Sequence, residues 1–77
     1  MAKWQPKIDE GTAIEIARRE CERRGWEWLE RVRVRASPPD TWNIRTAVGK
    51  RGGNGAFMID AHTGEVRYAT FAGEPSI

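Results

Sequence analysis

Residues 56–68 read Ala-Phe-Met-Ile-Asp-Ala-His-Thr-Gly-Glu-Val-Arg-Tyr, which is an apolar run, a turn and an alternating run. This order is typical of a β-hairpin, and we expect its strands near 56–61 and 65–71. Asp60 is placed to accept hydrogen bonds from N–H groups of the turn. Gly64 is placed to take the positive φ that closes it, since glycine has no Cβ to oppose that conformation. The rest of the chain must then supply the elements that pack on this hairpin.

The segment before the sheet predicts an amphipathic helix. Asp9 is the expected N-cap, with a competing capping box from Thr12 to Glu15, and Gly25 is the expected residue just past the C-terminal end. The apolar residues between these ends recur at helical spacing and form one stripe: Ala13, Ile14, Ile16, Ala17 and Cys21.

Two further strands are predicted between the helix and the hairpin. Residues 26–36 alternate, most clearly over 31–35, and residues 41–48 alternate again. Ser-Pro-Pro-Asp at 37–40 separates them as a rigid turn, and the Gly-rich stretch 49–55 leads to the hairpin. One helix and four antiparallel strands predict a two-layer α+β domain over residues 9–72, with an arm at 1–8 and a tail at 73–77.

The period of two in a strand assigns residues to the two faces of this sheet. The face under the helix is expected to hold the core residues Val32, Val34, Trp42, Ile44, Phe57, Ile59, Val66 and Tyr68. The opposite face is expected to hold Arg31, Arg33, Arg35, Arg45, Met58 and Arg67. Parity leaves three large aromatic residues unassigned: Trp26, Trp28 and Phe71.

Two stretches of the chain are similar to the PepSY-type domains, small helix-plus-sheet modules related in shape to the cystatin-like folds. Residues 8–17, Ile-Asp-Glu-Gly-Thr-Ala-Ile-Glu-Ile-Ala, resemble the opening of that family's helix. Residues 57–66, Phe-Met-Ile-Asp-Ala-His-Thr-Gly-Glu-Val, resemble its closing hairpin. The resemblance implies a non-enzymatic binding or inhibitory module, and it carries over no catalytic residue.

Length and composition narrow the class further. The 77 residues make one domain, and no apolar run reaches the ~18 residues of a membrane span. The first residues lack the apolar stretch of a secretory signal, and a lone Cys21 forms no internal disulfide. We therefore expect a cytoplasmic protein with no membrane partner.

The residue types that carry chemistry are not combined in a catalytic or metal-binding pattern. His62 lies in the hairpin turn without further ligands, and Cys21 lies on the apolar stripe of the helix. Glu27 and Glu30 stand among arginines, so salt-bridged surface charge is expected there. The loop 49–55 lacks the order of glycines that cradles a phosphate. We expect no enzyme activity, no metal and no cofactor.

Arginine is the remaining candidate for function. Ten of the thirteen cations are arginine, and seven of these fall between Arg18 and Arg35. We hypothesise a protein partner, bound in an inhibitory, immunity-type or regulatory role through carboxylates that pair with guanidinium groups. Two other ligands are open, a nucleic acid bound by the same face and the Gly-rich loop 49–55, and a second copy at an edge strand. A merely solvated surface is the remaining alternative. The residues expected to bind the partner are Arg31, Arg33, Arg35, Arg45, Arg51 and Arg67.

Overall fold

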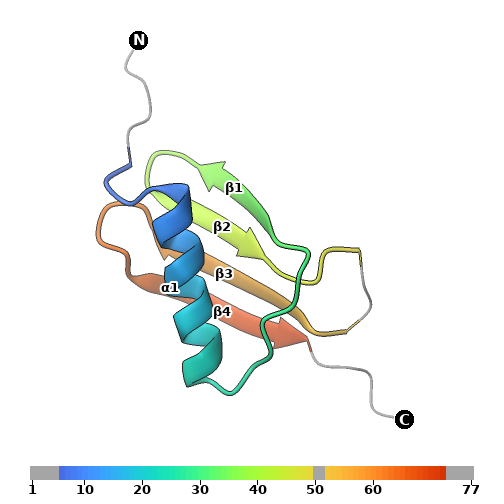
Figure 1. Cartoon of the computed structure of the whole chain (residues 1–77). Coiled ribbons are helices and arrows are strands. Elements are labelled where there is room, and N and C mark those ends of the chain that lie inside the picture. Colours follow the sequence, from blue (N-terminus) through green and yellow to red (C-terminus); the bar gives the residue numbers. More distant parts are fainter. Residues whose placement is uncertain (1–5, 50–51, 73–77) are drawn as a thin grey trace.

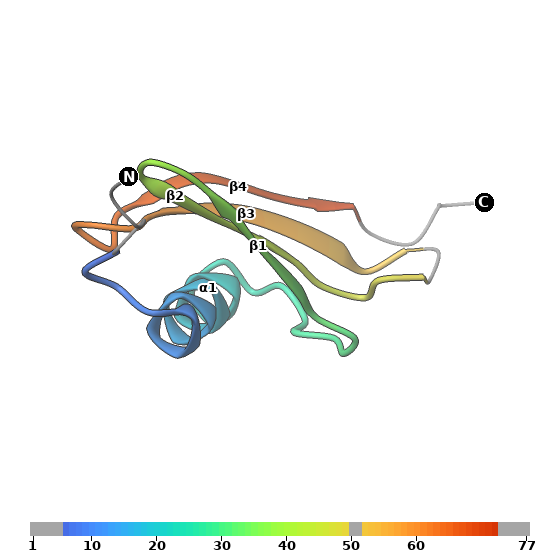
Figure 2. The ribbon, with the colours of Figure 1, turned by 90° about the horizontal axis from the view of Figure 1, so that it is seen from above.

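A computed structural model describes residues 6–49 and 52–72, and it confirms the predicted α+β fold. The four strands form one antiparallel sheet in the order β1-β2-β3-β4, with the helix packed on one face (Figures 1 and 2). The expected arm and tail lie for the most part outside the described residues, as does Arg51. The elements are α1 (Glu10–Arg23), β1 (Arg33–Ser37), β2 (Thr41–Arg45), β3 (Asn54–Asp60) and β4 (Val66–Ala72).

The helix begins and ends where the sequence predicts. The Asp9 side chain accepts a hydrogen bond from the Thr12 N–H at 2.7 Å, which satisfies one of the free donors of the first turn. Arg24 is the C-cap, and Gly25 follows it with a φ of +75°, the left-handed conformation that glycine adopts readily. The helix buries Ala13, Ala17 and Cys21 against the sheet.

The core lies between α1 and the two central strands. Ile44 of β2 and Phe57 and Ile59 of β3 are fully buried there. Burying each such side chain stabilises the fold by roughly 1.5–3 kcal/mol. Trp42 is also buried, and its indole N–H donates to the Ile8 carbonyl at 2.7 Å. The chain just before the helix is therefore fastened to the sheet.

The prediction of one strand over residues 26–36 is wrong, because only Arg33–Ser37 pairs as a strand. Trp26 stacks on Phe71 with 5.5 Å between ring centroids, and Trp28 lies 6.2 Å from the Phe57 ring. Both indoles close one end of the core, and the backbone there follows an irregular path rather than a ladder. Strand β2 is likewise shorter than predicted, since it ends at Arg45.

The hairpin turn is confirmed in detail. Asp60 accepts hydrogen bonds from the N–H groups of His62 (2.8 Å) and Thr63 (2.9 Å). Gly64 has a φ of +80°. These two N–H groups, together with the charge of Arg67, lower the pKa of Asp60 from 3.8 to about 2.

The placement of Tyr68 in the core is wrong, and a β-bulge is the reason. The register of β3 and β4 shifts between Met58 and Ile59, so that Met58 is opposite Tyr68 while Ile59 is opposite Val66. Arg67 is the extra residue of the bulged strand. Everything beyond it changes face relative to a regular strand, and Tyr68 lies 52% exposed on the side away from the helix.

The side of the sheet away from α1 is uncovered. Figure 2 shows the helix and the segment that follows it on one side, and no described helix or strand over the other. Among the described residues, no helix has the length and apolar character needed to cross a membrane.

Candidate functional site

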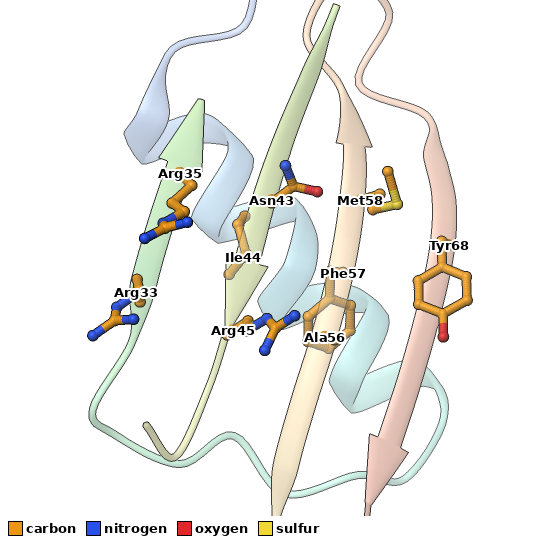
Figure 3. Close-up of a pocket in the computed structure, with 9 residues that line it drawn as sticks. All are labelled: Arg33, Arg35, Asn43, Ile44, Arg45, Ala56, Phe57, Met58 and Tyr68. Atoms are coloured by element: carbon orange, nitrogen blue, oxygen red, sulfur yellow. The ribbon is translucent and has the colours of Figure 1, made fainter. Parts of the chain in front are cut away.

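The uncovered side of the sheet carries a shallow hollow of about 470 Å³. All four strands contribute to it, and Figure 3 shows the side chains that line it. Arg33 and Arg35 come from β1, while Asn43 and Arg45 come from β2. Ala56 and Met58 of β3 and Tyr68 of β4 complete the outward-facing lining. We call this surface the open face.

Three of the predicted arginines meet on the open face. Strand pairing places Arg33 directly opposite Arg45, and Arg35 opposite Asn43. Directly opposed residues on neighbouring strands have Cβ atoms about 4.5–5.5 Å apart, and like charges in such a pair destabilise the sheet. In Figure 3 the Arg33 side chain leans to the outer side of β1, whereas the Arg45 side chain leans toward β3. The two guanidinium groups thus diverge from the shared register position.

No carboxylate within residues 6–49 and 52–72 pairs with Arg33, Arg35 or Arg45. The chain does neutralise other arginines: Arg23 donates to Glu20 at 2.6 Å, and Arg24 also pairs with that carboxylate. The two arginines lower the pKa of Glu20, chiefly through the hydrogen bonds of Arg23. The open face therefore differs from the helix surface in that its charge is left uncompensated.

Arg67, unlike the three arginines of the open face, pairs with carboxylates of the chain. Its guanidinium donates to Asp60 at 2.6 Å and lies 3.6 Å from a carboxylate oxygen of Asp40. The bulge that exposes Tyr68 also places Arg67 where it holds these two acidic side chains together. Its charge is already matched within the chain, and we assign it to the hairpin rather than to a binding surface.

The two other predicted arginines are separate from the hollow. Arg31 is exposed two residues before β1, and its carbonyl accepts the Val48 N–H at 2.9 Å. It does not line the hollow. Arg51 lies outside the described residues.

Tyr68 and Met58 are the large hydrophobic residues that the open face exposes, at 52% and 37%. The alternation of residues along the predicted strands placed Met58 on this face correctly, but it placed Tyr68 in the core. One pattern does point to the exposure of Tyr68: the positions of Val66 and Phe71 differ by five, which is an odd number. In a regular strand they cannot share a face, so burying both toward α1 requires a bulge between them.

The residues considered for catalysis are apart from one another and from the open face. Cys21 is buried, its thiol donates to the Trp26 carbonyl at 3.3 Å, and burial raises its pKa. His62 is exposed in the hairpin turn. The described part of the chain holds no group of three residues able to ligate a metal.

The prediction that Glu27 and Glu30 form ion pairs is wrong for the part of the chain that the structure describes. Both carboxylates are exposed and none of the ion pairs found includes them. They lie in the irregular segment before β1, where helical spacing brings no arginine to them.

No protein-family model, no curated protein and no solved structure matches the chain. The site must therefore be interpreted from its own geometry. Guanidinium groups bind planar oxyanions through two parallel hydrogen bonds, and an exposed aromatic ring offers a flat contact surface. The open face combines both on one side of a sheet.

Proposed function

We propose that this protein is a non-enzymatic binding module that engages an acidic protein partner through the open face. One observation carries the proposal: Arg33 and Arg45 oppose each other in register without a counter-ion among the described residues. Partner carboxylates that contact these guanidinium groups would replace repulsion by charge-assisted contacts. The PepSY-type resemblance and the cytoplasmic setting inferred from the sequence fit an inhibitory, immunity-type or regulatory role.

The compact grouping of the charges favours a protein ligand over a nucleic-acid strand. Neighbouring strands are about 4.8 Å apart, and residues two apart in a strand are about 6.7 Å apart. Arg33, Arg35 and Arg45 therefore form a cluster suited to one or two carboxylates. Such charges set the register and the rate of association more than they supply affinity.

The proposal is tested by titrating the ¹⁵N-labelled full chain with poly-L-glutamate and following backbone amide shifts by NMR. We expect shifts concentrated in β1 and β2 that persist at about 150 mM salt. The variant Arg33→Glu/Arg45→Glu is expected to lose them. The matched control is Lys7→Glu/Arg19→Glu, because it changes the net charge equally at exposed positions outside the hollow. Equal binding by the two variants would contradict the proposal.

Single-stranded nucleic acid is the second candidate, and the exposed ring of Tyr68 beside the arginines is the observation that favours it. Proteins that bind single strands combine a basic groove with aromatic rings on which bases stack. A mixed single-stranded oligonucleotide titrated into the same sample distinguishes the two ligands. Binding at about 150 mM salt, steeply weakened by more salt and reduced by Tyr68→Ala, would favour nucleic acid.

A further inference from the structure

We infer that the ligand of the open face is a short acidic–aromatic peptide segment, whose carboxylate pairs with the arginines while a neighbouring bulky side chain packs on Met58 and Tyr68. This inference rests on the proposed function and adds the second half of the recognition. It follows from how charge and apolar surface are distributed across the four strands.

The open face is divided between its two pairs of strands. All of its uncompensated charge lies on β1 and β2, at Arg33, Arg35 and Arg45. On β3 and β4 the outward-facing lining residues are Ala56, Met58 and Tyr68, none of which is charged. Arg67, the one cation of β4, is held by Asp60 and Asp40. A ligand that covers the whole hollow must therefore be acidic on one side and apolar on the other.

Arg45 lies at the boundary between these halves. It is opposite Ala56 in the register of β2 and β3, and its guanidinium leans toward β3 in Figure 3. A carboxylate that contacts Arg45 is thus brought beside the exposed parts of Met58 and Tyr68, which face each other across β3 and β4. The acidic group and the bulky group must be close neighbours in the ligand.

Polar groups of the hollow are also available to such a ligand. Within the described residues, neither the Asn43 amide nor the Tyr68 hydroxyl makes a side-chain hydrogen bond. Asn43 stands between Arg35 and Met58 in the register, so its amide can donate to a peptide carbonyl between the two anchoring side chains. A peptide backbone supplies these carbonyls at regular spacing, whereas free carboxylic acids do not.

The size of the hollow suits a few residues of chain. Two strand spacings, about 9.6 Å, separate the β1–β2 gap from the β3–β4 gap, which an extended peptide spans in about three residues. Single-stranded nucleic acid would meet charge on only one half of this width. The asymmetry of the face therefore favours the peptide.

Three synthetic peptides of equal length test the inference. The first contains Glu-Glu-Gly-Trp, the second replaces Trp by Gly, and the third replaces both Glu residues by Gln. Each is titrated into the ¹⁵N-labelled full chain, and its dissociation constant is taken from amide shifts. We expect the first peptide to bind about threefold to tenfold more tightly than the second, the range typical of one aromatic contact. It should also bind more tightly than the third, which lacks the carboxylates that pair with the arginines.

Two variants separate the halves of the site. Tyr68→Ala is expected to remove the advantage of the first peptide over the second. It should leave the binding of the second peptide, which has no Trp, unchanged. Arg33→Glu is expected to weaken both Glu-containing peptides by a similar factor. Because Tyr68 is half exposed and away from the core, its substitution should leave the fold intact, which the amide spectrum of the free variant verifies.

The outcomes distinguish this inference from the function on which it rests. If the first two peptides bind equally, and Arg33→Glu weakens the binding of both, the inference is overturned while the proposed acidic partner is supported. No binding of any Glu-containing peptide or of poly-L-glutamate would overturn both. A single-stranded oligonucleotide that displaces the first peptide and depends on Tyr68 would overturn the inference in favour of nucleic acid.

Discussion

Reversing one charge of the Arg33–Arg45 pair is expected to stabilise the protein and to weaken binding at the same time. The two residues are directly opposed in register, and such cross-strand pairs contribute about 0.2–1 kcal/mol. Both side chains are exposed and lean apart, so we take the lower half of that range. Arg33→Glu removes a repulsion and adds an attraction, each of about 0.2–0.5 kcal/mol, so that the free energy of unfolding rises by about 0.5–1 kcal/mol. For a domain of this size the Tm rises by about 2–8 °C.

The complete double-mutant cycle makes this expectation sharper. Arg33→Glu and Arg45→Glu should each stabilise, whereas the double variant restores a like-charge pair and should return to a Tm near that of the wild type. Glutamate has a lower β propensity than the residues favoured in strands, but that effect cancels in the cycle. The coupling free energy should be about 1–2 kcal/mol at about 10 mM salt and should largely vanish at about 1 M.

Thermal unfolding followed by circular dichroism measures all four corners of the cycle. The charge-matched control Lys7→Glu should leave the Tm nearly unchanged, because Lys7 makes no ion pair within the described residues. A coupling below about 0.3 kcal/mol at low salt would refute the reasoning, since additive mutations do not interact. It would mean that water separates the guanidinium groups and that no repulsion is present for a ligand to relieve.

Three further predictions concern the fold. Gly64→Ala should lower the free energy of unfolding by about 1 kcal/mol or more, because Gly64 has a φ of +80°. The control Gly11→Ala, in the helix, should not destabilise the protein. Equal effects of the two substitutions in chemical denaturation would contradict this prediction. Thr46→Val should lower the free energy of unfolding by about 1–3 kcal/mol, because the buried Thr46 hydroxyl accepts a hydrogen bond from the Gly55 N–H at 2.8 Å. An unchanged free energy of unfolding in chemical denaturation would mean that water replaces the hydroxyl. Asp60 has a folded pKa of about 2 against 3.8, so its stabilisation is complete above about pH 4 and is lost as the pH falls toward 2. Asp60→Asn should therefore be less stable than the wild type at neutral pH, with a difference that shrinks below about pH 4 and is lost below about pH 2 in acid titrations. A constant difference would argue against this account.

Local chemistry explains why much of the fold was predictable from the sequence. Asp9 and Gly25 mark the two ends of the helix, and Asp60 with Gly64 marks the hairpin turn. Each acts through its own backbone or through neighbours a few residues away. Such interactions depend on sequence spacing alone, so the pattern predicts them without knowledge of the tertiary structure.

The errors arose where distant contacts override the pattern. Residues 26–32 alternate like a strand, but Trp26 stacks on Phe71 and Trp28 lies against Phe57, and the backbone there does not pair in a ladder. The bulge at Arg67 reverses parity for the rest of β4, and it is stabilised by Asp40, which lies on another hairpin. For the site, the arginines of β1 and β2 were predictable from parity. The exposure of Tyr68 and the neutralisation of Arg67 were not, because both depend on that bulge.

Strand β1 gives the strongest reason to connect the open face with binding. It is an edge strand, and Val34 is its only residue that is not exposed. Its contribution to the core is therefore small, while Arg33 and Arg35 add repulsion against Arg45 to a domain whose total stability is about 5–10 kcal/mol. A ligand that neutralises these charges binds the native state alone and so holds β1 more firmly against β2. Under the proposed function, the interaction that supplies recognition would also stabilise the strand that presents it, and would offset an arrangement that weakens the free protein.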